Sequence, residues 1–100
     1  MNTQLIQSLN RTYPVEALRI VSLIREYQVT KENRLQPTAR NLVDTCRRNI
    51  AETALRKYAT CAIKRKLIVE KSSFKDKPTY ELTLKGLELA KQLEAAEYRV

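Results

Sequence analysis

The chain has 100 residues, of which 43% are hydrophobic and 30% charged, so length and composition predict one soluble globular domain and exclude a disordered tail. No apolar run approaches the ~20 residues that a membrane span needs, and residues 1–10 lack the features of a secretory signal, so we expect a cytoplasmic protein that does not enter the membrane. Two cysteines are too few for a disulfide framework, and the absence of histidine removes the commonest general base and metal ligand, so we expect neither a cofactor nor a metal site.

The N-terminal third of the chain predicts two helices. Leu5 and Leu9 have the spacing of a short amphipathic helix, which we place in an N-terminal extension of residues 1–13. Pro14 suits the first position of a helix, and apolar residues follow it at helical spacing. We therefore predict a second helix over residues 14–27 with a broad apolar face.

The middle of the chain predicts two further helices joined by a short turn. Pro37 marks the start of a short helix. A longer helix over residues 50–66 follows, and Asn49 is positioned to cap it through a capping box with Glu52. The turn between the two helices, residues 47–49, has the length found in a helix-turn-helix.

The longer helix is predicted to be amphipathic. A projection at 100° per residue places one stripe of mostly apolar side chains along it, made of Ala51, Ala54, Leu55, Tyr58 and Ala62. The opposite face is polar and carries Thr53, Arg56, Lys57, Thr60 and Lys64.

The last third of the chain predicts a β-hairpin and a final helix. Residues 67–69 are apolar and residues 79–84 alternate, which indicates two strands of a hairpin over residues 67–84 with a basic loop at its tip. Thr83 is positioned to cap a helix over residues 84–97. The inner face of that helix is expected to hold Leu84, Leu87, Leu89, Ala90 and Leu93.

Positive charge is concentrated in the window of residues 31–77. This window holds thirteen basic and five acidic residues, so its net charge of 13 − 5 = +8 equals that of the whole chain. The remaining residues sum to zero. Segregation of this kind indicates a binding surface, and the phosphates of a nucleic acid are its simplest partner.

The order of these elements, together with two segments, carries a resemblance to a known family. Residues 62–68, AIKRKLI, are similar to the end of a recognition helix, and residues 79–90, TYELTLKGLELA, resemble a wing followed by a last helix. Over residues 14–95 the chain resembles winged helix-turn-helix transcriptional regulators of the MarR and PadR kind. Lys66 stands where such families often have glycine. The resemblance implies an α+β, mostly α fold: a single winged helix-turn-helix domain with a two-stranded β-hairpin wing and flanking helices, in which residues 37–66 form the helix-turn-helix.

The resemblance also implies where DNA would bind, because the second helix of such a motif enters the major groove. The side chains expected to contact base edges are Thr53, Arg56, Lys57 and Thr60. The side chains expected to contact the DNA backbone are Arg40, Arg47 and Arg48 around the turn, Lys64 on the long helix, and Lys71, Lys75 and Lys77 on the wing.

Three functional hypotheses follow. The first is a nucleoid-associated, sequence-specific regulator of transcription that binds double-stranded DNA as a repressor. We expect it to be a homodimer that pairs through residues 1–9, the first long helix and the apolar face of residues 84–98. The second is a winged helix used as a protein-interaction or RNA-binding module, because folds of this type are reused. The third, an enzyme, is not expected, since no nucleophile–base pair, glycine-rich phosphate loop or metal motif occurs.

Four other residues have alternative interpretations. Cys46 and Cys61 are either small buried hydrophobic residues or redox sensors, because Lys57 and Lys64 near Cys61 would lower a thiol pKa. Tyr58 is expected in the core. Phe74 lies at the tip of the hairpin, where it contacts DNA or a partner, or folds back.

Overall fold

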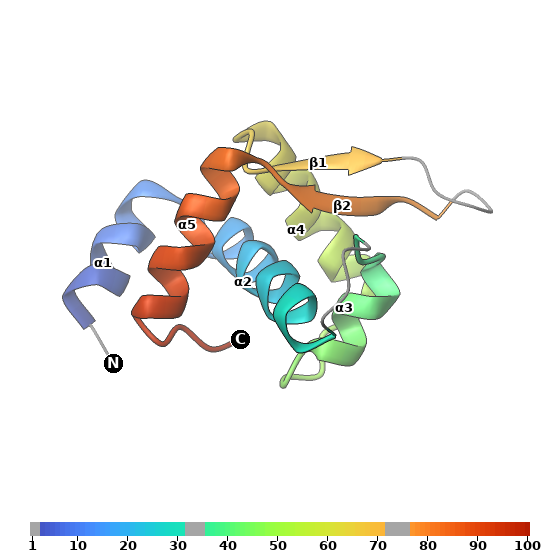
Figure 1. Cartoon of the computed structure of the whole chain (residues 1–100), viewed down its shortest axis with the longest axis horizontal. Coiled ribbons are helices and arrows are strands. Elements are labelled where there is room, and N and C mark those ends of the chain that lie inside the picture. The colour runs from blue at the N-terminus through green and yellow to red at the C-terminus, as the bar shows by residue number, and fades with distance from the viewer. Residues whose placement is uncertain (1–2, 32–35, 72–76) are drawn as a thin grey trace.

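A computed structural model of the chain describes residues 3–31, 36–71 and 77–100. Within these residues, five helices and one antiparallel two-stranded sheet form an α+β, mostly helical fold (Figure 1). In Figure 1, α2 runs through the centre, with α1 and α5 on one side and α3 and α4 on the other. The elements are α1 Thr3–Thr12, α2 Val15–Thr30, α3 Ala39–Thr45, α4 Glu52–Lys64, β1 Ile68–Lys71, β2 Thr79–Leu82 and α5 Leu84–Ala95.

The central position of α2 follows from its sequence. A helix that is apolar around most of its circumference is stable only when other elements cover it. The neighbouring helices do so with side chains such as Leu42 of α3, Leu55 of α4 and Leu93 of α5. The residues of α2 that are buried are Ala17, Leu18, Ile20, Val21, Leu23 and Ile24.

The start of α3 is fixed by Thr38, not by Pro37 as predicted. The Thr38 hydroxyl accepts a hydrogen bond from the Asn41 backbone N–H at 3.2 Å, and the Asn41 side-chain oxygen accepts one from the Thr38 N–H at 3.0 Å. This is a complete capping box. The Pro37 carbonyl accepts a hydrogen bond from the Tyr80 N–H at 2.9 Å, so the proline joins α3 to β2 instead.

The predicted capping box at the start of α4 is wrong. Ala51 occupies the cap position, and no side chain caps the helix. The Glu52 carboxylate lies 3.3 Å from the guanidinium of Arg56 one turn later. The connector between α3 and α4 runs over residues 46–51 and is therefore longer than the predicted turn of residues 47–49.

The end of α4 is a Schellman motif built on a residue other than glycine. The Leu67 N–H donates to the Ala62 carbonyl at 3.0 Å and the Lys66 N–H donates to the Ile63 carbonyl at 2.9 Å. Lys66 has a φ of 60°, a conformation that favours glycine. The chain therefore makes the reversal that a glycine would make more easily.

The hairpin and α5 are joined through Thr83 and Gly86, within the segment of residues 82–86. The Thr83 hydroxyl accepts from the Gly86 N–H at 3.0 Å and donates to the Lys66 carbonyl at 2.7 Å. A Cβ on Gly86 would lie 1.8 Å from the Leu67 carbonyl oxygen. Thr83 thus caps α5 as predicted, and the absence of a side chain at Gly86 allows α5 to pack on the base of the hairpin.

The predicted inner face of α5 needs one correction. Leu89, Ala90 and Leu93 are buried and Leu87 is half-buried, but Leu84 is 84% exposed. Leu84 is the first residue of the helix, ahead of the turns that pack on α2. The last helical residue is Ala95, two residues before the predicted end. No helix in the described part of the chain is long and apolar enough to span a bilayer.

Candidate nucleic-acid interface

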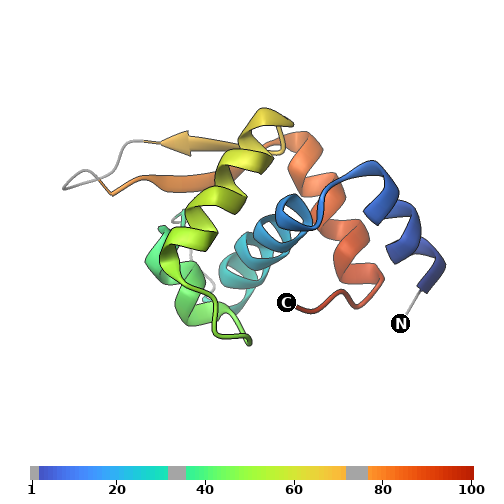
Figure 2. The ribbon, with the colours of Figure 1, turned by 180° about the vertical axis from the view of Figure 1, so that it is seen from behind.

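The long helix α4 has one buried face and one exposed face. Leu55, Ala59 and Ala62 are buried against the rest of the molecule. Figure 2 shows α4 along the near side of the molecule, with no other ribbon in front of it. The polar face is confirmed, because the residues assigned to it are all exposed: Thr53, Arg56, Lys57, Thr60 and Lys64. The predicted apolar stripe needs one correction, since Ala51 is exposed at the cap position before the helix.

Side chains on this face differ in how they are held. Arg56 forms an ion pair with Glu52 at 3.3 Å. The Thr60 hydroxyl donates to the Arg56 carbonyl at 3.1 Å, which leaves its oxygen able to accept. Among the described residues, Lys57 and Lys64 have no ion-pair partner. These two lysines are therefore the cations of this face most available to an added anion.

The basic residues before α4 lie on α3 and on the connector. Arg40 is exposed and lies 3.7 Å from Asp44 on the same helix. Arg48 is exposed on the connector. Arg47 lies on the connector too, around the turn as predicted, and its guanidinium is 3.5 Å from the Glu26 carboxylate of α2.

The hairpin extends past α3 and α4 (Figures 1 and 2). Lys71 of β1 forms a cross-strand ion pair with Glu81 of β2. The Lys71 side chain is 53% exposed and the Glu81 side chain is 35% exposed. Lys77 is exposed just before β2. Lys75 and Phe74 lie outside the described residues.

Ion pairs on this surface would oppose the binding of an added anion only weakly. An exposed pair contributes about 0.2–1 kcal/mol, because water and salt screen it. A hydrogen bond from arginine or lysine to phosphate is charge-assisted and short. Arg40, Arg56 and Lys71 can therefore exchange a carboxylate for a phosphate or a base edge at a small cost.

A half-buried cluster behind α4 holds the helix in place, and we did not predict it. Arg19 of α2 donates to the Tyr58 hydroxyl at 3.3 Å and lies 6.0 Å from the centre of the same ring. The hydrogen bond to Tyr58 raises the pKa of Arg19 further, against the effect of its partial burial. Burial raises the pKa of Tyr98, and Arg19 opposes that rise. The sequence signal was a single charged residue, Arg19, inside the mostly apolar Ala17–Ile24 run.

Both cysteines are half-buried at the edge of the core. The Cys61 sulfur accepts a hydrogen bond from Arg65 at 3.4 Å, so Arg65 is a further cation beside this thiol. Cys46 is half-buried against the core. In the described ranges, no three Cys, Asp or Glu side chains come together in a way that could hold a metal ion.

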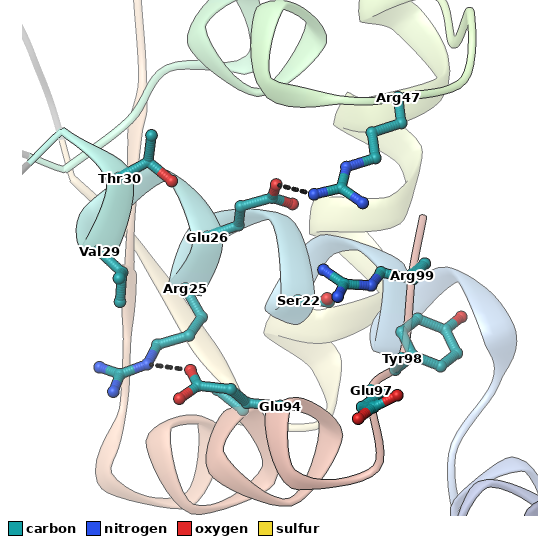
Figure 3. Close-up of a pocket in the computed structure, with 11 residues that line it drawn as sticks. Ser22, Arg25, Glu26, Val29, Thr30, Arg47, Glu94, Glu97, Tyr98 and Arg99 are labelled. Carbon is teal, nitrogen blue, oxygen red and sulfur yellow. Dashed lines mark hydrogen bonds and ion pairs between the residues drawn. The ribbon is translucent and has the colours of Figure 1, made fainter. Parts of the chain in front are cut away.

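A pocket of about 330 Å³ lies on a different side of α2, between α2, the end of α5 and the connector before α4 (Figure 3). Two ion pairs cross its walls, Arg47 with Glu26 and Arg25 with Glu94 at 3.1 Å. The sequence analysis did not predict this pocket, because its walls come from three segments far apart in the chain.

Comparisons with protein-family models, curated proteins and solved structures find no match for this chain. The inference of function therefore depends on the residues described above and on their geometry.

Proposed function

We propose that this chain is a winged helix-turn-helix protein that binds double-stranded DNA sequence-specifically and represses transcription. The observation that carries the proposal is the exposed polar face of α4, which presents two threonines and three basic residues on one side of the helix. The elements beside it, α3, the connector and the hairpin, belong to the window that holds the whole net charge of the chain.

In this proposal α4 lies in the major groove. Arg56 and Lys57 suit guanine, whose O6 and N7 accept two hydrogen bonds, and the threonine methyl groups suit the methyl of thymine. Arg40, Arg47 and Arg48 would contact phosphates on one side of α4, and Lys71 and Lys77 would contact them from the wing. The net charge supplies affinity for any duplex, whereas the α4 side chains supply selectivity.

The test is selection of bound duplexes from random DNA, followed by binding measurements at several salt concentrations. Arg56→Ala should lose about 1–3 kcal/mol of discrimination at one base position, whereas Lys77→Ala should weaken all duplexes alike and lower the salt slope by about 1. Lys91→Ala removes an exposed lysine from α5, outside the charged window, and serves as the control. No enrichment of any duplex, or stronger binding to RNA, would refute the proposal.

A homodimer belongs to the same proposal. Leu9, Leu89 and Leu93, which we assigned to the dimer contact, are buried inside the monomer, so any contact depends on exposed neighbours such as Leu84. Equilibrium sedimentation should give twice the chain mass, and Leu84→Lys should return it to the monomer. Operator half-sites about one helical turn apart would agree with a two-fold dimer.

A further inference from the structure

The pocket in Figure 3 has the chemistry of a binding site for a small molecule. Its volume of about 330 Å³ lies at the lower end of the range of ligand sites. The guanidinium groups of Arg47 and Arg99 both point toward the space beside Glu26 and Ser22. Arg99 has no ion-pair partner among the described residues. A cation is therefore available inside a concave site.

The lining also contains negative charge and apolar surface. Three arginines and three glutamates line the pocket, so its formal charge is balanced. Val29, which is 54% exposed, and Tyr98 contribute apolar surface to the wall. The glutamates would repel a strongly anionic ligand, and the arginines would repel a cation. A ligand with one charge of each sign and an apolar group complements all three parts of the lining.

We propose that this pocket binds a small zwitterion with an apolar side chain, the chemistry of a free aliphatic or aromatic amino acid. Its carboxylate would be held by Arg99 and by Arg47, because a planar guanidinium group can donate two hydrogen bonds to one carboxylate. Its ammonium group would be held by Glu26 and the hydroxyl of Ser22, and its side chain would lie on Val29.

Two connections join this site to α4. Arg47 belongs to the connector that leads into α4. The charge of Arg19 opposes the rise in the pKa of Tyr98, and Arg19 donates a hydrogen bond to Tyr58 of α4 at 3.3 Å. Arg47 already pairs with Glu26 in this pocket, and a ligand whose carboxylate adds a second contact would hold Arg47 there more firmly. Arg47 would then be less available to a DNA phosphate, so the ligand should weaken DNA binding about fivefold or more. This regulatory step rests on the proposed function, but ligand binding does not.

The binding test uses the full chain, titrated calorimetrically with L-leucine and L-phenylalanine. N-acetyl-L-leucine lacks the ammonium charge and L-leucinamide lacks the carboxylate, so each should bind at least about tenfold more weakly than L-leucine. Arg99→Gln and Glu26→Gln should each weaken L-leucine about tenfold. Arg11→Gln, which changes an exposed arginine on α1, is the control and should bind normally. No binding, equal binding of the blocked compounds, or unchanged binding by both pocket variants would overturn the site.

The regulatory test has two readouts. Without DNA, L-leucine should shift the backbone amide resonances around Tyr58 in wild type but not in Arg99→Gln. With DNA, it should lower the affinity of wild type only. Amide shifts in a protein that binds no DNA would refute the proposed function and leave the site standing. Bound ligand with unchanged α4 resonances and unchanged DNA affinity would overturn the regulatory step.

Discussion

The reversal after α4 depends on a lysine in a backbone conformation that suits glycine. Lys66 has a φ of 60°. The N–H groups of Lys66 and Leu67 donate hydrogen bonds to carbonyls in the last turn of α4 and so end the helix. A side chain in this conformation costs roughly 1 kcal/mol relative to glycine. The lysine at this position therefore has a cost in stability and leaves the path of the chain unchanged.

Lys66→Gly should raise the free energy of unfolding by up to about 1 kcal/mol, because the left-handed conformation carries no Cβ strain in glycine. Urea unfolding followed by circular dichroism measures the change. Lys64→Gly, in the last turn of α4 before the reversal, is the matched control and should lower stability by about 1 kcal/mol. A loss of stability in both variants would contradict the explanation.

Gly86 needs the absence of a side chain for a different reason, because it lies against the backbone of Leu67. Replacing glycine by alanine inside a helix ordinarily adds stability. Gly86→Ala should instead lower the free energy of unfolding by about 3 kcal/mol, because the new Cβ would overlap the Leu67 carbonyl and push α5 off the hairpin. Thermal or urea unfolding would show this, and Glu88→Ala on the exposed side of α5 should change little. A stabilised Gly86→Ala would exclude the close contact.

At the scale of elements, the sequence predicted the type and order of every helix and strand but misplaced several ends. Periodicity depends on many residues, so a helix such as α4 is evident from its apolar stripe. An end depends on one or two side chains that compete for the same backbone groups. Asn49 offered a cap for α4, but the chain uses Ala51 there, and Thr38 caps α3 instead.

Thr38, which caps α3, and Asn49, the predicted cap of α4, can be compared directly. Thr38→Ala should lower the free energy of unfolding by about 1 kcal/mol, because the Asn41 N–H loses its acceptor at the start of α3. Asn49→Ala should stay within about 0.5 kcal/mol of wild type, since Asn49 is exposed and caps no helix. Denaturant midpoints of the two variants decide between the predicted and the observed cap. The reverse order of effects would restore the capping box at Asn49.

At the scale of the whole molecule, α2 joins the part of the chain that carries the net charge to the neutral part. One side of α2 contacts α3 and α4, and another contacts α5. The tail after α5 also packs on the core, because Val100 is buried and Tyr98 is half-buried against it. The tail is therefore part of the folded body and contributes to its stability.

Stability should fall in alkali because burial raises the pKa of Tyr98 above its ordinary value. A raised pKa in the folded state means that the folded protein keeps its proton more firmly than the unfolded chain. The contribution is full below the unfolded pKa of about 10 and is lost as pH rises through the folded pKa. Burial acts in the same direction on the pKa of Tyr80.

Urea unfolding at a series of pH values measures this decline. Tyr98→Phe should flatten part of it above about pH 10, and Tyr98→Phe with Tyr80→Phe should flatten more. An unchanged pH dependence in the double variant would show that these hydroxyls titrate alike in the folded and unfolded states.

The sequence by itself determined the elements, the polar face of α4 and the location of the charge. Each of these depends on residues close together in the chain, whose periodicity and composition act locally. The tertiary structure decided which charges are paired, as for Arg47 with Glu26, and that Arg19 reaches Tyr58. It also decided that Leu84 is exposed and that a pocket opens beside α2. These features join residues far apart in the chain, and only the packing of the helices brings them within contact.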